Sequence, residues 1–158
     1  MKKLNFKLIL IQLLGIFFFI EGIQKIYIAS DAERFMCLLK YDVSSECWKN
    51  LNSTFTTLGD FLAKRAYWSF GAFVIGILII SLINLKNKNP FLNTFFVFLL
   101  AFLIFPTGIF FRGKISDYFN YFGGIFAKNY QYSFIISGII FTLIGSLLIW
   151  RSYRIETV

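Results

Sequence analysis

The sequence contains no histidine, only two cysteines and only two prolines among its 158 residues. Without histidine the chain cannot build a bis-histidine haem site, a histidine-ligated zinc or copper site, or a nucleophile activated by histidine. Two cysteines alone cannot hold an iron–sulfur cluster, and neither a P-loop nor a GxGxxG motif is present. We therefore expect no catalytic residues, no cofactor-binding residues and no metal ligands, and we expect that the protein is not an enzyme.

Charged residues are also scarce, at 15%, whereas 58% of the residues are hydrophobic and 22 are phenylalanine. Soluble domains are usually about 45–50% apolar. Four apolar runs reach the length of about 20 residues that a helix needs to cross a bilayer, and they cover residues about 8–28, 66–85, 91–111 and 132–150. In lipid, a helix satisfies the hydrogen bonds of its backbone internally, and we therefore predict an all-α membrane protein. Residues 1–158 would form a single integral membrane domain, a four-transmembrane-helix bundle in the lipid bilayer.

Basic residues outnumber acidic ones by 16 to 8, but they are scattered over both predicted membrane faces and form no stripe for nucleic acid. Lysine and arginine in short segments mark the cytoplasmic or matrix side of a membrane. This bias predicts that both termini lie on that side and that residues about 29–65 and 112–131 form outer loops. The basic residues on the side of the termini are Lys2, Lys3, Lys7, Lys86, Lys88, Arg151 and Arg154.

Both cysteines lie in the first outer loop. Cys37 and Cys47 enclose nine residues, and a disulfide between them would stabilise the loop by roughly 3 kcal/mol in the chain-entropy model. The alternative is a redox-active pair, but redox pairs normally use a C-x-x-C motif with a second pair to relay electrons. We therefore favour a disulfide-stapled first outer loop. Ser30 and Glu33 form a capping box that predicts a short helix beginning beside them.

Three polar residues share one face at the outer end of the first predicted helix. Glu21, Gln24 and Lys25 are three and four residues apart, and ionisable groups within a membrane span suggest a functional site. The simpler interpretation, which we favour, is that Glu21 and Lys25 pair in the interface while Lys25 extends outward toward water. Gln12 lies deeper, and we expect it to hydrogen-bond another helix.

Small residues form stripes on two of the predicted helices. Gly138, Thr142 and Gly145 lie on one face of the fourth helix, and Gly15 and Gly22 lie on one face of the first. Such faces allow close backbone approach. They can pack the bundle internally or dock a partner, and the sequence does not separate these two uses.

The layout resembles the tetraspan superfamily of claudins and peripheral-myelin or epithelial membrane proteins. The Cys37…Cys47 spacing is similar to that family's cysteine pair. Asp60–Ala66, in which an acid precedes Arg65 by five, and Ile115–Asn120, which contains Asp117, resemble claudin segments beside the second and third spans. The resemblance implies that Cys37 and Cys47 form the staple, that Asp60 and Arg65 orient the loop on the bundle, and that the protein mediates adhesion. A sequon at Asn52 would permit glycosylation of the loop in a eukaryote.

A second resemblance covers the first 45 residues. Leu14–Phe17 and Glu21–Lys25, followed by Phe35 and Tyr41, are similar to bacterial DoxX-like four-helix membrane proteins. Those proteins are linked to redox partners, so this resemblance implies an accessory subunit of a membrane redox or energy-transducing complex.

Together these patterns predict a non-enzymatic four-span protein that mediates assembly or adhesion through its outer loop and lateral helix packing. The predicted partners are other membrane-protein subunits or further copies of the chain. The accessory-subunit function is the alternative.

We expect the substitution Cys37→Ser to lower the amount of folded protein, because the staple would no longer restrict the unfolded chain. The amount is measured by size-exclusion chromatography of the detergent-solubilised protein. A thiol relay predicts the opposite pattern, in which electron transfer to quinone is lost and the folded amount is unchanged.

Overall fold

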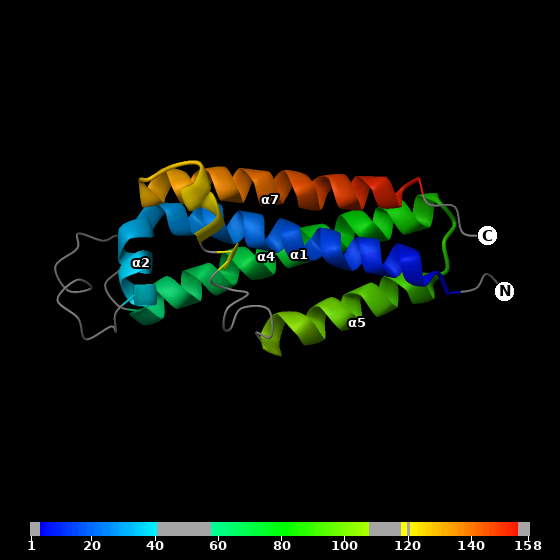
Figure 1. Ribbon diagram of the computed structural model, residues 1–158. Coiled ribbons are helices and arrows are strands. Elements are labelled where there is room, and N and C mark those ends of the chain that lie inside the picture. Colours follow the sequence, from blue (N-terminus) through cyan, green and yellow to red (C-terminus); the bar gives the residue numbers. More distant parts are fainter. Residues whose placement is uncertain (1–3, 41–57, 108–117, 120, 155–158) are drawn as a thin grey trace.

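The computed structural model describes residues 4–40, 58–107, 118–119 and 121–154, and this part of the chain is helical (Figure 1). The structure contains four long helices and several shorter helical segments, and no strand occurs within the ranges described. The elements in order are α1 (Phe6–Ile28), η1 (Ala29–Asp31), α2 (Ala32–Lys40), α4 (Leu58–Lys86), α5 (Phe91–Thr107), η3 (Phe122–Ile125) and α7 (Tyr130–Ser152).

The long helices run up and down, so that chain segments far apart in sequence meet at each end of the bundle. The start of α1, the connection between α4 and α5, and the end of α7 lie together at one end, which we call the termini end (Figure 1). The short helix α2 lies at the opposite end, which we call the α2 end. This arrangement fits the predicted bundle of four helices.

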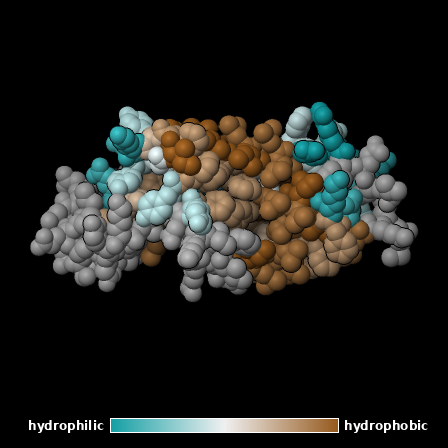
Figure 2. All heavy atoms as spheres, in the orientation of Figure 1, coloured by the Kyte–Doolittle hydropathy of each residue, from teal (hydrophilic) through white to brown (hydrophobic). Residues whose placement is uncertain are grey.

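Three helical stretches are long and apolar enough to cross a membrane, namely Phe6–Cys37, Gly59–Lys86 and Tyr130–Ser152, and Phe91–Ile104 is a shorter apolar helix. On the face shown in Figure 2, apolar residues form a band across the middle of the molecule, and hydrophilic residues gather toward both ends. The length and composition of these helices are those of a helical membrane protein. Helix α4 begins at Leu58, well before the predicted start of its span, because hydropathy marks the apolar part of a helix and not its polar extension.

The first short helix forms as expected, but without the predicted cap. Ser30 lies inside η1, which joins α1 directly to α2, and its hydroxyl donates to the Tyr27 carbonyl at 2.7 Å. Ser30 therefore bonds back to the preceding turn, as serine hydroxyls do within helices. The chain continues through a tighter 3₁₀ turn directly into α2.

The small-residue stripes of α1 and α7 face each other. A Cβ atom on Gly22 would lie 2.8 Å from the Gly138 carbonyl oxygen, and one on Gly145 would lie 2.7 Å from the Gly15 carbonyl oxygen. Thr142 belongs to the same contact, and its hydroxyl donates to the Gly138 carbonyl at 2.8 Å. Of the two uses that the sequence left open, the geometry corresponds to internal packing. The seven-residue spacing of the glycines in both helices favours a left-handed crossing.

The turn between α4 and α5 is fixed by backbone hydrogen bonds. Lys88 adopts the left-handed conformation with φ 52°, Lys88 N–H donates to the Leu85 carbonyl at 3.0 Å, and Asn89 N–H donates to the Asn84 carbonyl at 2.9 Å. This pair of bonds is the Schellman motif that closes helix C-termini. Pro90 follows two residues later and directly precedes α5, where its missing N–H is not needed.

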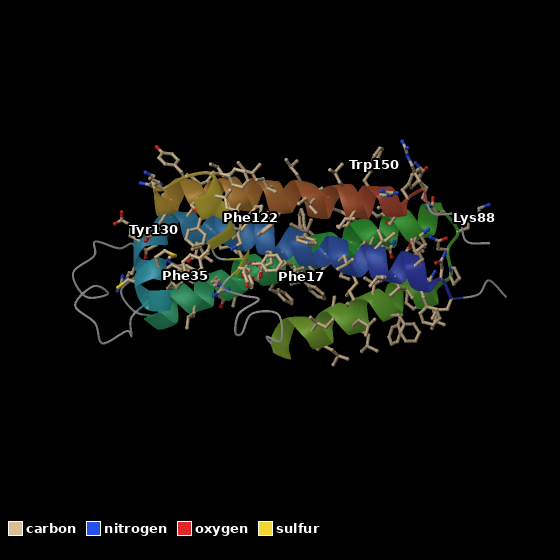
Figure 3. All side chains as sticks on the ribbon, in the orientation of Figure 1. Phe17, Phe35, Lys88, Phe122, Tyr130 and Trp150 are labelled. Atoms are coloured by element: carbon tan, nitrogen blue, oxygen red, sulfur yellow. The ribbon has the colours of Figure 1, made fainter. Side chains whose placement is uncertain are left out.

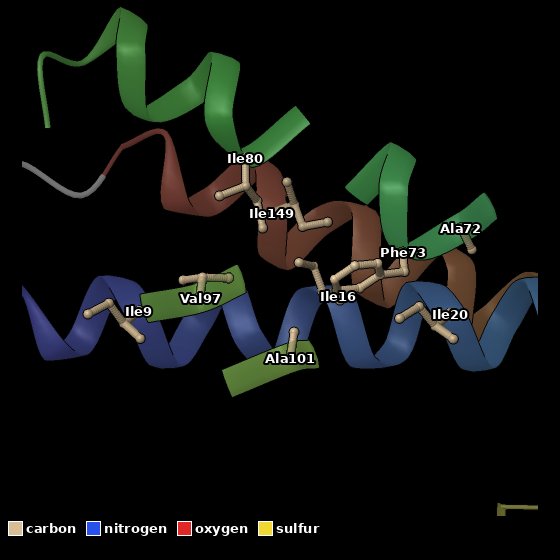
Figure 4. Packing of buried hydrophobic residues seen from close by; sticks show 9 residues of the cluster. All are labelled: Ile9, Ile16, Ile20, Ala72, Phe73, Ile80, Val97, Ala101 and Ile149. Atoms are coloured by element: carbon tan, nitrogen blue, oxygen red, sulfur yellow. The ribbon is translucent and has the colours of Figure 1, made fainter. Parts of the chain in front are cut away.

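An apolar core runs along the inner face of α1 between the two ends of the bundle (Figure 4). All four long helices contribute to it, and its buried members are Ile9, Ile16, Ile20, Ala72, Phe73, Ile80, Val97, Ala101 and Ile149. The members on each helix are mostly four or seven residues apart, the spacing of one helical face. Helix α1 is thus the central helix, and the other three pack around it.

We expect Gly22→Ala to lower the free energy of unfolding by about 1–3 kcal/mol, because the new methyl group would meet the α7 backbone. The matched control is Gly71→Ala in α4, where a Cβ would meet no atom within 4 Å and the better helix propensity of alanine is mildly stabilising. Thermal unfolding of both variants in one detergent, followed by circular dichroism, measures the difference. Equal unfolding temperatures would contradict a tight α1–α7 contact.

Candidate functional site

Buried and half-buried polar side chains gather at two levels of the bundle. The termini-end network contains Gln12, Asn84, Asn89, Thr94 and Ser152, and the α2-end cluster contains Glu21, Gln24, Lys25, Arg65 and Ser69. Gln12 and Gln24 are separated by roughly 18 Å along α1, at 1.5 Å per residue. The two groups therefore lie in opposite halves of the bundle.

The termini-end network joins all four long helices through side-chain amides and hydroxyls. Gln12 Nε2 donates to Asn84 Oδ1 at 2.9 Å and to Ser152 Oγ at 3.2 Å. Asn84 Nδ2 donates in return to Gln12 Oε1 at 3.2 Å and to Thr94 Oγ1 at 2.8 Å. The expectation that Gln12 bonds another helix is therefore confirmed, and it bonds two. Hydrogen bonds of this kind fix which faces of the helices meet in lipid.

The α2-end cluster begins with the polar face of α1 that the sequence indicated. Glu21, Gln24 and Lys25 all lie on one side of α1, and all three are buried. Glu21 interacts electrostatically with Lys25 and also with Arg65 of α4. One carboxyl group and two basic groups therefore lie together in the half of the bundle toward the α2 end.

The expectation that Lys25 extends outward is wrong. Its side chain is 1% exposed, and its Nζ lies 5.4 Å from the centre of the Phe134 ring and 5.7 Å from the centre of the Phe141 ring. Both rings belong to α7. Because α7 crosses so close to α1, Lys25 lies under α7, and cation–π contact replaces hydration of the ammonium group.

Arg65 connects α4 to the same face of α1. Its Nη2 and Nε donate to Gln24 Oε1 at 3.1 and 3.4 Å. The amide of Gln24 in turn donates to Ser69 Oγ, and the Ser69 hydroxyl donates to the Arg65 carbonyl at 2.8 Å. Both ends of the Gln24 amide are therefore used, and α4 is anchored to α1 at this level as well.

Aromatic residues of α2, α4 and α7 cover the cluster from the α2 end. The Phe35 ring lies at this end of the bundle (labelled in Figure 3). Its centre is 5.6 Å from that of the Phe134 ring and 5.9 Å from that of the Phe61 ring. The Arg65 guanidinium lies 5.5 Å from the centre of the Phe35 ring. These rings belong to a second apolar core of Ile28, Ala29, Ala32, Phe35, Met36, Phe61 and Phe134. The short helix α2 therefore covers the charged cluster at the α2 end of the bundle.

The other predicted site residues are distributed around this end. Cys37 is buried in α2, at 2% exposed, and Asp60 is half-buried in the first turn of α4. Cys47, Asn52 and Asp117 lie outside the described residues, so the Cys37–Cys47 staple, the glycosylation of Asn52 and the role of Asp117 stay predictions. The described residues contain no group of three or more His, Cys, Asp or Glu side chains, and we assign no metal ligands.

Several buried polar residues were not singled out from the sequence. Ser69, Asn84, Thr94 and Ser152 all make the contacts above, and all lie near the ends of apolar runs. At such positions a polar residue is expected simply because the apolar run ends there. The available signal was the amide of Asn84, since a carboxamide at the edge of an apolar helix requires a partner in lipid.

Comparison of the chain with family models, with curated proteins and with solved structures finds no match.

We expect Glu21→Gln and Lys25→Met each to lower the stability of the protein, because each removes one charge of a buried interacting pair. The loss is about 3–5 kcal/mol where the remaining charge has no other partner of opposite sign, and it should be smaller for Lys25→Met, because Glu21 keeps its interaction with Arg65. The double variant should lose less than the sum of the two. Thermal unfolding of the four proteins measures this coupling. The control Lys64→Met, at an exposed neighbour of Arg65, should change stability little, and additive losses would contradict the pairing.

Proposed function

We propose that this chain is a non-enzymatic four-span membrane protein that assembles laterally with another membrane-protein subunit or with further copies of itself. In this proposal α1, α4, α5 and α7 each cross the bilayer, and both termini lie on the cytoplasmic or matrix side. Support comes from the band of apolar residues, the up-and-down order of the helices, and the concentration of basic residues in the short segments at the termini end.

The observation that carries the proposal is a row of phenylalanine rings that runs from the surface of α4 through one buried ring to the surface of α5. Phe70, Phe73, Phe98 and Phe102 follow one another, with ring centres 6.3, 5.9 and 5.9 Å apart. We call this row the aromatic ladder. Phe73 is buried, whereas Phe70 is 56% and Phe102 is 49% exposed. The ladder therefore holds rigid rings at a surface and needs little ordering to pack against a partner helix.

The small-residue stripes support the same choice of surface. Gly15, Gly22, Gly138 and Gly145 are covered by α1–α7 packing, so in this arrangement they are not open to a partner. The lateral contact is therefore assigned to the side of α4 and α5. The outer loop supplies the second contact, with the Cys37–Cys47 disulfide holding it over the α2 end, in the manner that the claudin resemblance implies.

The α2-end cluster favours the alternative function, an accessory subunit of a membrane redox or energy-transducing complex. Ionisable residues buried within membrane helices commonly serve charge or proton movement, and Glu21, Gln24 and Lys25 belong to the segment that resembles DoxX-like proteins. Such a subunit would also assemble laterally. The two functions therefore differ in the partner and not in the surface.

The experiment is affinity purification of the full chain in a mild detergent after brief cross-linking in the membrane, followed by mass spectrometry. We expect a membrane partner at fixed stoichiometry. A larger complex supports the accessory function, and copies of the chain alone support self-assembly. The double variant Phe70→Leu/Phe102→Leu should reduce the recovered partner roughly tenfold, since each aromatic contact contributes about 0.5–1.5 kcal/mol beyond its buried area.

The matched control is Phe126→Leu, at a ring that is 54% exposed and packs against Phe122 of η3. Recovery of the partner should be unchanged in this variant. An uncross-linked monomer in every preparation would overturn the proposal, and equal losses in the control and the double variant would overturn the role of the ladder.

A further inference from the structure

A groove lies between α1 and α7 at the termini end of the bundle. It has a volume of about 750 Å³ and is lined by Lys7 and Ile11 from α1 and by Leu147, Leu148, Trp150, Arg151 and Arg154 from α7 and the residues after it. Trp150 marks its position on α7 in Figure 3. The proposed assembly surface on α4 and α5 lies elsewhere, so the groove is independent of it.

The charges around this groove are all of one sign. Lys7, Arg151 and Arg154 line it, and no acidic side chain is among the lining residues. The carboxylates in the described ranges belong to Glu21, Asp31, Glu33 and Asp60. The nearest of these along α1 is Glu21, which is 14 residues from Lys7 and hence roughly 21 Å along the axis. The three cations therefore attract an anion from outside the described chain.

The lining changes from charged to apolar with depth, in the same way on both helices. Ile11 lies one turn deeper than Lys7 on α1, and Leu147 lies one turn deeper than Arg151 on the antiparallel α7. The Arg154 guanidinium is 4.6 Å from the centre of the Trp150 ring, which holds this cation at the rim. A ligand that fits must carry its negative charge at the rim and apolar chains below it.

We propose that this groove binds an anionic phospholipid from the leaflet at the termini end. The lipid phosphate lies among Lys7, Arg151 and Arg154, and an acyl chain follows Ile11, Leu147 and Leu148 toward the middle of the membrane. Guanidinium groups match the oxygen geometry of a phosphate and can bind it with two hydrogen bonds. Basic sites between membrane helices on this side are suited to anionic headgroups.

The test is native mass spectrometry of the full chain in detergent, titrated with phosphatidylglycerol or with phosphatidylcholine of the same acyl chains. We expect phosphatidylglycerol to bind about tenfold or more tightly, since each basic contact contributes about fivefold. The variant Lys7→Gln/Arg151→Gln should weaken phosphatidylglycerol binding by about 25-fold, and Lys7→Arg/Arg151→Lys, which keeps both charges and one guanidinium group, should keep most of the affinity. Excess inorganic phosphate should not displace the lipid, because it cannot occupy the apolar part of the groove.

The matched control is Lys86→Gln/Lys88→Gln, which removes two exposed basic residues at the same end without touching the groove lining. Its affinity should be unchanged, and circular dichroism and size-exclusion chromatography verify that each variant is folded. Equal binding of the two lipids, equal losses in the control and groove variants, or displacement of lipid by inorganic phosphate would each overturn the proposal.

Discussion

The close approach of α1 and α7 is the contact on which the rest of the structure depends. Lipid is as apolar as the helix surfaces, so burying leucine against leucine gives little drive for association in a membrane, and helices associate by tight packing and by hydrogen bonds. Glycines at seven-residue intervals bring the two backbones together. This approach places Phe134 and Phe141 over Lys25, Ser152 beside Gln12, and Lys7 beside Arg151. A wider spacing would undo all three arrangements.

Polar contacts then decide how firmly each remaining helix is attached. Helix α4 is hydrogen-bonded to α1 at both levels, through Asn84 at the termini end and through Arg65 and Ser69 at the α2 end. The polar bonds of α5 are near its start, where Asn93 Oδ1 accepts from the Asn5 backbone at 3.2 Å and Thr94 meets Asn84. Beyond that point α5 contributes Val97 and Ala101 to the core and leaves Phe98 and Phe102 at the surface. An asymmetric attachment of this kind leaves one helix side available to a neighbour.

The helices could be predicted from the sequence, because runs of apolar residues and the short Lys86–Pro90 connection allow few other structures in lipid. The small-residue stripes were visible too, but their use depended on which helix lay opposite, and residue spacing within one helix does not tell that. The error at Lys25 has the same origin. A lysine near a helix end normally extends to water. Only the position of α7 shows that the path from Lys25 to water is blocked by this helix. Ser30 shows the limit of local motifs, since a capping box requires a non-helical residue and the chain here continues through η1.

The distribution of charge connects topology with the inferred lipid site. Basic residues in short segments are usually considered as signals that fix orientation during membrane insertion, and for that purpose they need only be on the correct side. Lys7 and Arg151 are far apart in sequence, and the α1–α7 contact brings them to one groove with an apolar floor. Orientation alone does not require this convergence, nor Trp150 against Arg154. Once the glycines fix the two helices at close range, the basic residues that would set orientation in the proposed topology also line the inferred anion site. Among the described residues, the acidic side chains all lie in the other half of the bundle.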